Sequence, residues 1–242
     1  MPRFQYLIQR LLLLAAVVAS LATFAGEELI STATQKNGEV IPYILNSNNA
    51  APAYVFILFP GGSGIVDPHL ENGVLVYRAK GNFLVRSRKW MVDDEFATVT
   101  TNAGPSQERI QAVIDDLNRR YANVKIYLMG TSRGTEDTIA LADYLSEKIA
   151  GEIHTSSMTR IWSFNAKEYK NRHLIVHHKN DSCRVTPYAS ALRSHERYGS
   201  ELMTMEGGIS VGDPCEALAY HGYNGIERET VDAIKKWVKS NN

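Results

Sequence analysis

The sequence lacks an excess of charge of either sign, and it lacks repeats, low-complexity tracts and interdomain linkers. Its 242 residues include 26 of Lys and Arg and 26 of Asp and Glu, a formal net charge of +0. This balance gives no reason to expect nucleic acid or an anionic membrane as a partner. The hydrophobic fraction of 44% is ordinary for a globular protein. One folded domain with a sizeable core is therefore expected.

Long apolar runs are also scarce, and the one that exists lies near the N-terminus. Residues 11–22 are apolar apart from Ser20, arginines flank their start, and Thr23-Phe24-Ala25 ends the run with a small-x-small pattern. This arrangement predicts a secretory signal peptide at 1–25, with the folded domain at 26–242 and a periplasmic or secreted location. A membrane anchor is the alternative. The run is short for a span, which needs about 20 apolar residues, so no stable membrane anchor is expected.

Cysteine is nearly absent, since Cys183 and Cys215 are the only two. In an exported protein an even number of cysteines indicates a disulfide bond, so we expect these two to be joined. Two buried free thiols are the alternative.

The apolar periodicity predicts strands that alternate with helices. The Lys36-Asn37-Gly38 turn between two β-like runs, 30–35 and 39–45, indicates an antiparallel hairpin at the start. Further strands are expected at 54–59, 96–101, 125–129, 152–157, 173–177 and 202–205, and helices at 81–92, 106–121, after 134, at 187–198 and at 227–239. This alternation predicts a mostly parallel sheet with helices on both faces. The chain between the strands at 152–157 and 173–177 is too short for a large lid domain, so an open site is expected.

One motif joins a strand to a helix. Gly130-Thr131-Ser132-Arg133-Gly134 follows the strand at 125–129, and apolar residues at helical spacing follow it. The glycines allow a tight turn that projects the serine hydroxyl, and the N–H groups of the helix start can stabilise an oxyanion. A second match, Gly208-Ile209-Ser210-Val211-Gly212, precedes Asp213-Pro214 and no helical pattern, so Ser210 is interpreted as a loop serine.

A glycine-rich segment, Pro60-Gly61-Gly62-Ser63-Gly64, follows the strand at 54–59. It lacks the Gly-Lys-Ser/Thr ending of a P-loop and the spacing of a dinucleotide fingerprint. The remaining interpretations are a plain tight turn, or a loop whose backbone N–H groups point into an anion site.

The order of strand, Gly-x-Ser-x-Gly and helix resembles the nucleophile elbow of the α/β-hydrolase superfamily. The resemblance covers nearly all of residues 30–240, and the phrases at 130–135, 176–184 and 212–215 look like small exported bacterial serine hydrolases of unassigned substrate. It implies acyl transfer to water, with Ser132 as nucleophile. The superfamily's chain order implies Asp181, just past the strand at 173–177, as the acid. It implies His221, between the last strand and the terminal helix, as the base.

Non-catalytic roles are the alternatives for these residues: Asp181 could close a turn, and His221 could be a surface or core histidine. The resemblance also implies an oxyanion hole from the backbone N–H groups of Gly62, or Ser63, and Arg133. Pro60 stands where many members have histidine. The Arg133 side chain could meet a substrate carboxylate or pair on the surface with Glu136 or Asp137.

The cysteines flank the acid and the base in sequence, because Cys183 is two residues after Asp181 and Cys215 is six before His221. A disulfide between them would tie the two loops together and limit drift between acid and base. Two adjacent histidines, His177 and His178, could bind a metal ion. No suitably spaced carboxylate accompanies them, so neither a metal nor a cofactor is expected.

The expected function is a serine hydrolase, most simply a carboxylic-ester hydrolase, acting on a small-molecule or polymeric ester. The alternatives are an amide or peptide hydrolase, an acyltransferase, and a non-catalytic binding protein that keeps the fold. Neither the acyl group, the leaving group nor the oligomeric state follows from the sequence.

Overall fold

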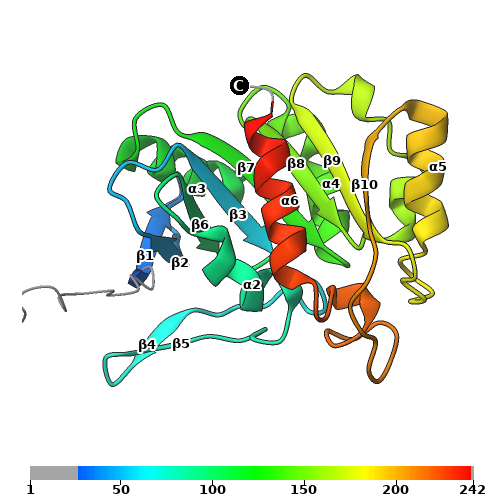
Figure 1. The fold of residues 1–242 in the computed structure, drawn as a ribbon. Helices are drawn as coiled ribbons and strands as arrows, with labels where there is room; N and C mark the ends of the chain where they lie inside the picture. Colours follow the sequence, from blue (N-terminus) through cyan, green and yellow to red (C-terminus); the bar gives the residue numbers. More distant parts are fainter. Residues whose placement is uncertain (1–26, 241–242) are drawn as a thin grey trace, which may run out of the picture.

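The computed structural model describes residues 27–240, so the predicted signal peptide and its cleavage site lie outside the described residues. The described chain is built on an eight-stranded sheet with the order β1-β2-β6-β3-β7-β8-β9-β10 (Figure 1). β1 (Glu27–Thr34) and β2 (Val40–Ser47) form the predicted antiparallel hairpin, and β2 is also antiparallel to β6. The other neighbouring pairs are parallel, and they join β6 (Phe96–Thr100), β3 (Tyr54–Phe59), β7 (Lys125–Thr131), β8 (Gly151–Thr155), β9 (Arg172–His178) and β10 (Glu201–Met205).

Helices cover both faces of the sheet, as predicted. α2 (Phe83–Met91) and α6 (Glu227–Lys239) pack on the face that is nearer in Figure 1. The opposite face is covered by α3 (Gln107–Arg120), α4 (Gly134–Leu145) and α5 (Tyr188–Tyr198). Every residue of β3 is buried, because alternate side chains of a strand point to opposite faces and both faces of this strand are covered.

The segment between β8 and β9 holds only two short 3-10 helices, η1 (Thr159–Ser163) and η2 (Ala166–Glu168). The expectation that no large lid domain is present is therefore confirmed. Within residues 27–240 no helix is long and apolar enough to cross a membrane.

The sequence analysis missed one hairpin, formed by β4 (His69–Glu71) and β5 (Val74–Val76). It projects from the body of the protein below the sheet in Figure 1. Its strands have three residues each, which is too short for an alternating pattern to register. The Asn72-Gly73 pair at its tip, with both φ angles positive, is a hairpin signal that could have revealed it.

Candidate active site

Ser132 lies on a sharp turn between β7 and α4. Its φ of 51° is in the left-handed region, which is strained for a residue with a side chain. Gly130 and Gly134 make the turn possible, because a Cβ on Gly130 would lie 2.7 Å from the Gly134 carbonyl oxygen, and one on Gly134 would lie 2.3 Å from the Phe59 carbonyl oxygen. The predicted turn geometry is therefore present. Glycine is needed at both positions because another backbone segment lies where a Cβ atom would be.

The glycine-rich loop packs directly against this elbow. β3 pairs with β7, with Phe59 opposite Gly130, so the loop after β3 emerges beside Ser132. A Cβ on Gly61 would lie 2.8 Å from the Cβ of Ser132, and Gly62 has a φ of +65°. Among residues 27–240, the backbone N–H groups of Gly62 and Arg133 have no hydrogen-bond acceptor. Two unused N–H groups beside the Ser132 side chain could hold a negatively charged oxygen.

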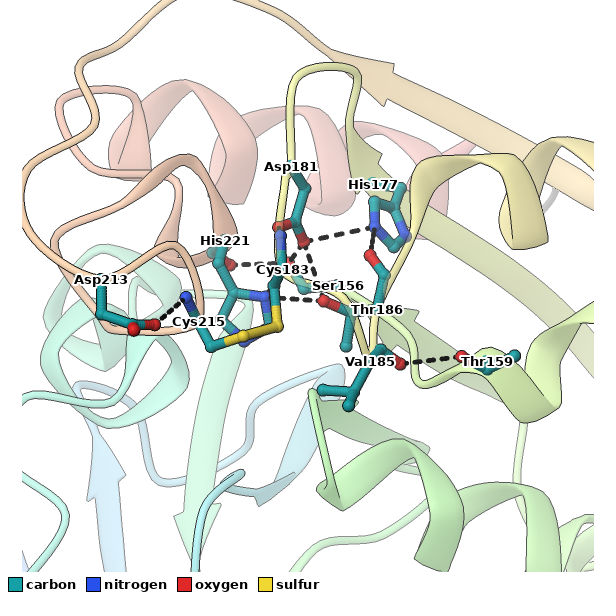
Figure 2. The surroundings of a disulfide bond; sticks show 10 residues. All are labelled: Ser156, Thr159, His177, Asp181, Cys183, Val185, Thr186, Asp213, Cys215 and His221. Carbon is teal, nitrogen blue, oxygen red and sulfur yellow. Dashed lines mark hydrogen bonds and ion pairs between the residues drawn. A yellow bond between two sulfur atoms is a disulfide. The ribbon is translucent and has the colours of Figure 1, made fainter.

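Asp181 and His221 lie together, although 40 residues separate them in sequence. His221 Nδ1 is 3.0 Å from Asp181 Oδ2, and the Asp181 side chain is fully buried. Thr186 Oγ1 donates to the same carboxylate oxygen over 3.1 Å, and the Cys183 N–H donates to Oδ1 over 3.0 Å. Figure 2 shows how these groups converge.

The hydrogen bonds around Asp181 decide its charge. Burial by itself would raise the pKa of Asp181, but hydrogen bonds with His177 and His221, together with the Cys183 N–H, hold that pKa well below its usual range. The carboxylate is therefore ionised at neutral pH. An ionised carboxylate that accepts from His221 Nδ1–H fixes the tautomer in which Nε2 carries a lone pair.

His177 and His178 form hydrogen bonds and a ring contact with the neighbouring loops, which no pattern in the sequence indicates. His177 Nε2 is 2.9 Å from the Thr186 carbonyl oxygen and 3.4 Å from Asp181 Oδ2. His178 Nε2 is 2.9 Å from the Gly207 carbonyl oxygen, and its ring stacks on Tyr220. Both histidines therefore brace the loops that carry Asp181 and His221.

The loop that carries His221 is held at several points. The predicted disulfide between Cys183 and Cys215 is present in the structure (Figure 2). Ser156 Oγ donates to the His221 carbonyl oxygen over 2.7 Å. Arg86, on α2, donates to the carbonyl oxygens of Ala217 and Gly222 over 2.9 and 2.6 Å. These partners come from distant parts of the chain, so no local sequence pattern marks them.

Ser132 and His221 line the same cavity, which has a volume of about 360 Å³. Its other walls come from the glycine-rich loop, from residues 78–83 and from residues 215–217. Ser132 Oγ makes no hydrogen bond to any residue between 27 and 240. Asp181 lies behind His221, outside the lining of this cavity.

Two further expectations concern Ser210 and Arg133. Ser210 is exposed in a loop with no helix after it, as interpreted from the sequence. The Arg133 side chain is exposed, and Glu136 pairs instead with Arg160 at 3.6 Å. Arg133 forms no ion pair within 4.0 Å in the described part of the chain. Burial raises the pKa of Asp137, one of the two surface partners expected for Arg133, and the charge of Arg133 acts to lower it.

Comparison with known proteins gives a clear result for structure and none for sequence. No protein-family model matches the chain. No curated protein matches it either. Many solved structures do match, although all those compared below are less than 25% identical.

An α/β serine hydrolase without a lid from Xanthomonas campestris superposes with a TM-score of 0.57 at 11% identity, covering 89% of this chain and 97% of its own. The esterase domain of a Rhodothermus marinus protein gives 0.57 at 10% identity, with coverage of 87% and 97%. A puromycin-hydrolysing peptidase of Mycobacterium tuberculosis gives 0.60 at 13% identity, covering 92% of this chain and 40% of the peptidase. The protein therefore has the α/β-hydrolase fold, in a form without a lid domain.

Proposed function

We propose that this protein is a serine hydrolase that cleaves carboxylic esters through an acyl-enzyme intermediate. The observation that carries the proposal is the 3.0 Å contact between Asp181 and His221, with His221 lining the same cavity as the strained Ser132. A buried ionised acid, a histidine that it orients and a serine on an elbow are the three groups that nucleophilic catalysis by serine needs.

The reaction would run in two halves. His221 Nε2 takes the Ser132 hydroxyl proton as Oγ attacks the ester carbonyl, and the N–H groups of Gly62 and Arg133 stabilise the negative oxygen. Collapse of this intermediate breaks the bond to the alcohol, which leaves with the proton from His221. Water then attacks the acyl-enzyme with His221 again as base, which releases the carboxylic acid and restores Ser132.

Esters are proposed before amides because an alkoxide is a better leaving group than an amide anion. Cleavage of an ester therefore depends less on proton donation by His221 to the leaving group. The same three groups serve a peptidase, and the similar structures include proteins named as an esterase and as a peptidase. An acyltransferase differs only in the acceptor that replaces water. Product analysis with an added alcohol would separate it from a hydrolase.

We further propose that the protein is exported. The Cys183–Cys215 disulfide supports this, because such bonds persist mainly in oxidising compartments.

The test is to label the purified mature protein with a fluorophosphonate and to map the adduct by mass spectrometry. We expect one adduct, on Ser132, in the wild type and in Ser210→Ala, a control that removes the serine of the second Gly-x-Ser-x-Gly. We expect none in Ser132→Ala and strongly slowed labelling in His221→Ala. A folded, oxidised protein that takes up no probe would support a binding protein instead, and an adduct on Ser210 would refute the assignment of the elbow.

A further inference from the structure

Three buried residues outside the cavity form a cluster of donor atoms. Glu152 and His154 lie on β8, and His173 lies on β9 directly opposite Glu152. Glu152 and His154 are fully buried and His173 is 4% exposed. One donor atom from each side chain lies within 4.8 Å of the other two. β8 and β9 are neighbours in the sheet, beside α4, in Figure 1.

Two protonation states of His154 satisfy its hydrogen bonds. Thr138 Oγ1 has one hydrogen and lies 3.1 Å from the Thr135 carbonyl oxygen and 2.9 Å from His154 Nδ1. When Thr138 donates to the carbonyl, it accepts from His154 Nδ1, and Nε2 of a neutral His154 carries a lone pair. When Thr138 donates to Nδ1 instead, Nε2 carries the proton.

A hydrogen bond selects one state of His173. Its Nε2 is 2.9 Å from Asn171 Oδ1, an acceptor, so Nε2 carries the proton and Nδ1 the lone pair. His154 Nε2 and His173 Nδ1 face each other at 3.3 Å. In the first state of His154 two lone pairs face each other, and a metal ion can bind both nitrogens; in the second state, without a metal, His154 Nε2 donates to His173 Nδ1.

Glu152 adds a third donor group to this arrangement. Neither of its carboxyl oxygens has a hydrogen-bond partner among residues 27–240, although both are buried. A buried carboxyl group without partners is costly, and an ionised one far more so unless a cation accompanies it.

We propose that Glu152, His154 and His173 bind a zinc ion through the carboxylate, Nε2 and Nδ1. Imidazole nitrogen and carboxylate oxygen are zinc ligands, and at bonds of about 2.1 Å two ligands of a tetrahedral ion lie about 3.4 Å apart. The two facing nitrogens already have that spacing. The fourth position falls to the second Glu152 oxygen or to water.

The outer contacts fit this assignment. Ligating histidines donate their second N–H to an oxygen, and oxygen atoms lie in reach of both second nitrogens: Thr138 Oγ1 is 2.9 Å from His154 Nδ1, and Asn171 Oδ1 is 2.9 Å from His173 Nε2. The rings of Phe164 and Tyr169 lie about the site, with Phe164 5.0 Å from the His154 ring and Tyr169 5.1 Å from the His173 ring.

The site has a structural role and is separate from the proposed reaction. None of its three ligands lines the cavity that holds Ser132 and His221. It does join β8 to β9, and hydrogen bonds continue from it toward the elbow. Thr138 donates to the Thr135 carbonyl, and Thr135 Oγ1 donates to the Ser132 carbonyl over 2.6 Å.

The first test measures zinc on the whole mature protein. After removal of metals with a chelator, we expect one tightly bound zinc per chain in a metal-buffered titration. Free zinc a hundredfold above its dissociation constant should raise the melting temperature by about 5–10 °C. Cobalt in place of zinc should give the intense visible absorption of a four-coordinate ion. A weak six-coordinate spectrum, or no bound metal, would overturn the proposal without any variant.

Variants locate the ion. Glu152→Gln and His173→Gln should each weaken zinc binding by about 100-fold or more. The matched control is His69→Gln, because His69 lies 2.9 Å from Glu71 in an exposed pair and should not affect the stoichiometry. His221→Gln controls for zinc at the proposed catalytic histidine. Unchanged affinity in both cluster variants, or loss only in His69→Gln or His221→Gln, would refute the site.

Glu152→Gln also separates zinc from a buried proton. If the site binds zinc, the variant should lose the zinc-dependent rise in melting temperature while its metal-free form stays as stable as the metal-free wild type. If Glu152 is simply a protonated acid, zinc would have no effect on either protein, and the proposal would be wrong.

Discussion

Reduction of the Cys183–Cys215 disulfide should lower stability strongly but activity only weakly. The two cysteines are 32 residues apart, and the loop-closure relation gives about 3.7 kcal/mol for a ring of that size. For a domain of this length each kcal/mol changes the melting temperature by about 2–4 °C. The expected fall is therefore about 7–15 °C.

Activity is expected to survive because other contacts hold the histidine loop. His221 keeps its 3.0 Å contact with Asp181, and its carbonyl keeps the 2.7 Å bond from Ser156. Arg86 still binds the Ala217 and Gly222 carbonyls. Each of these remaining hydrogen bonds contributes roughly 0.5–1.5 kcal/mol to holding the loop in place. At 25 °C, where the reduced protein remains folded, the rate of fluorophosphonate labelling should therefore fall by less than about tenfold.

The assay compares calorimetric melting and labelling rate for wild type with and without reductant. The Cys183→Ala/Cys215→Ala double variant is the control, because reductant should not change it further. A change in melting temperature below about 2 °C would refute the loop-closure reasoning. A loss of labelling beyond about 100-fold in protein with native circular dichroism would show that the disulfide alone positions the histidine.

Three further predictions concern single residues. Thr186→Val removes a donor to Asp181 and should slow labelling by about tenfold, while Thr186→Ser should retain the rate. The pKa of Asp181 is lower in the folded protein than its unfolded-state pKa of about 3.9. Its carboxylate therefore stabilises the fold above about pH 3.9, and this contribution is lost as the pH falls below that value. The free energy of unfolding in urea, measured from pH 7 to pH 3, should depend less on pH in Asp181→Asn than in the wild type. Gly222→Ala places a Cβ 2.0 Å from the Ala217 carbonyl oxygen, so it should lower the melting temperature by several degrees, whereas Gly81→Ala meets nothing within 4 Å and should not. Equal melting temperatures for the two glycine variants would contradict this reasoning.

Much of the fold could be predicted because its signals are local. Most strand and helix boundaries fall within a residue or two of the ranges expected from apolar periodicity. The helix expected at 106–121 begins after Ser106, whose side chain accepts from the Arg109 N–H. Ser132 and Asp181 were expected just past the ends of two strands, and in a parallel sheet such ends meet at one edge. The superfamily's chain order implied His221, between the last strand and the terminal helix, as the third residue. The hairpin of β4 and β5 was missed because three-residue strands carry too little pattern.

The contacts around the acid and the base could not be predicted in the same way. Thr186, His177, Ser156 and Arg86 look like ordinary polar residues in the sequence, and each acquires a role only from a partner that packing brings to it. Nothing in the sequence relates His173 to Glu152, and only the pairing of β8 with β9 puts the two residues opposite each other.

The sequence by itself therefore determined the order of elements, the position of the elbow and the two cysteines that flank the acid and the base. These depend on propensity, periodicity and chain order, which act over a few residues. Only the tertiary structure decided that Gly61 touches Ser132, that Asp181 is buried yet ionised, and that Glu152 has no partner. Those outcomes depend on which buried groups meet across the sheet, because desolvation and hydrogen bonding are set by neighbours in space.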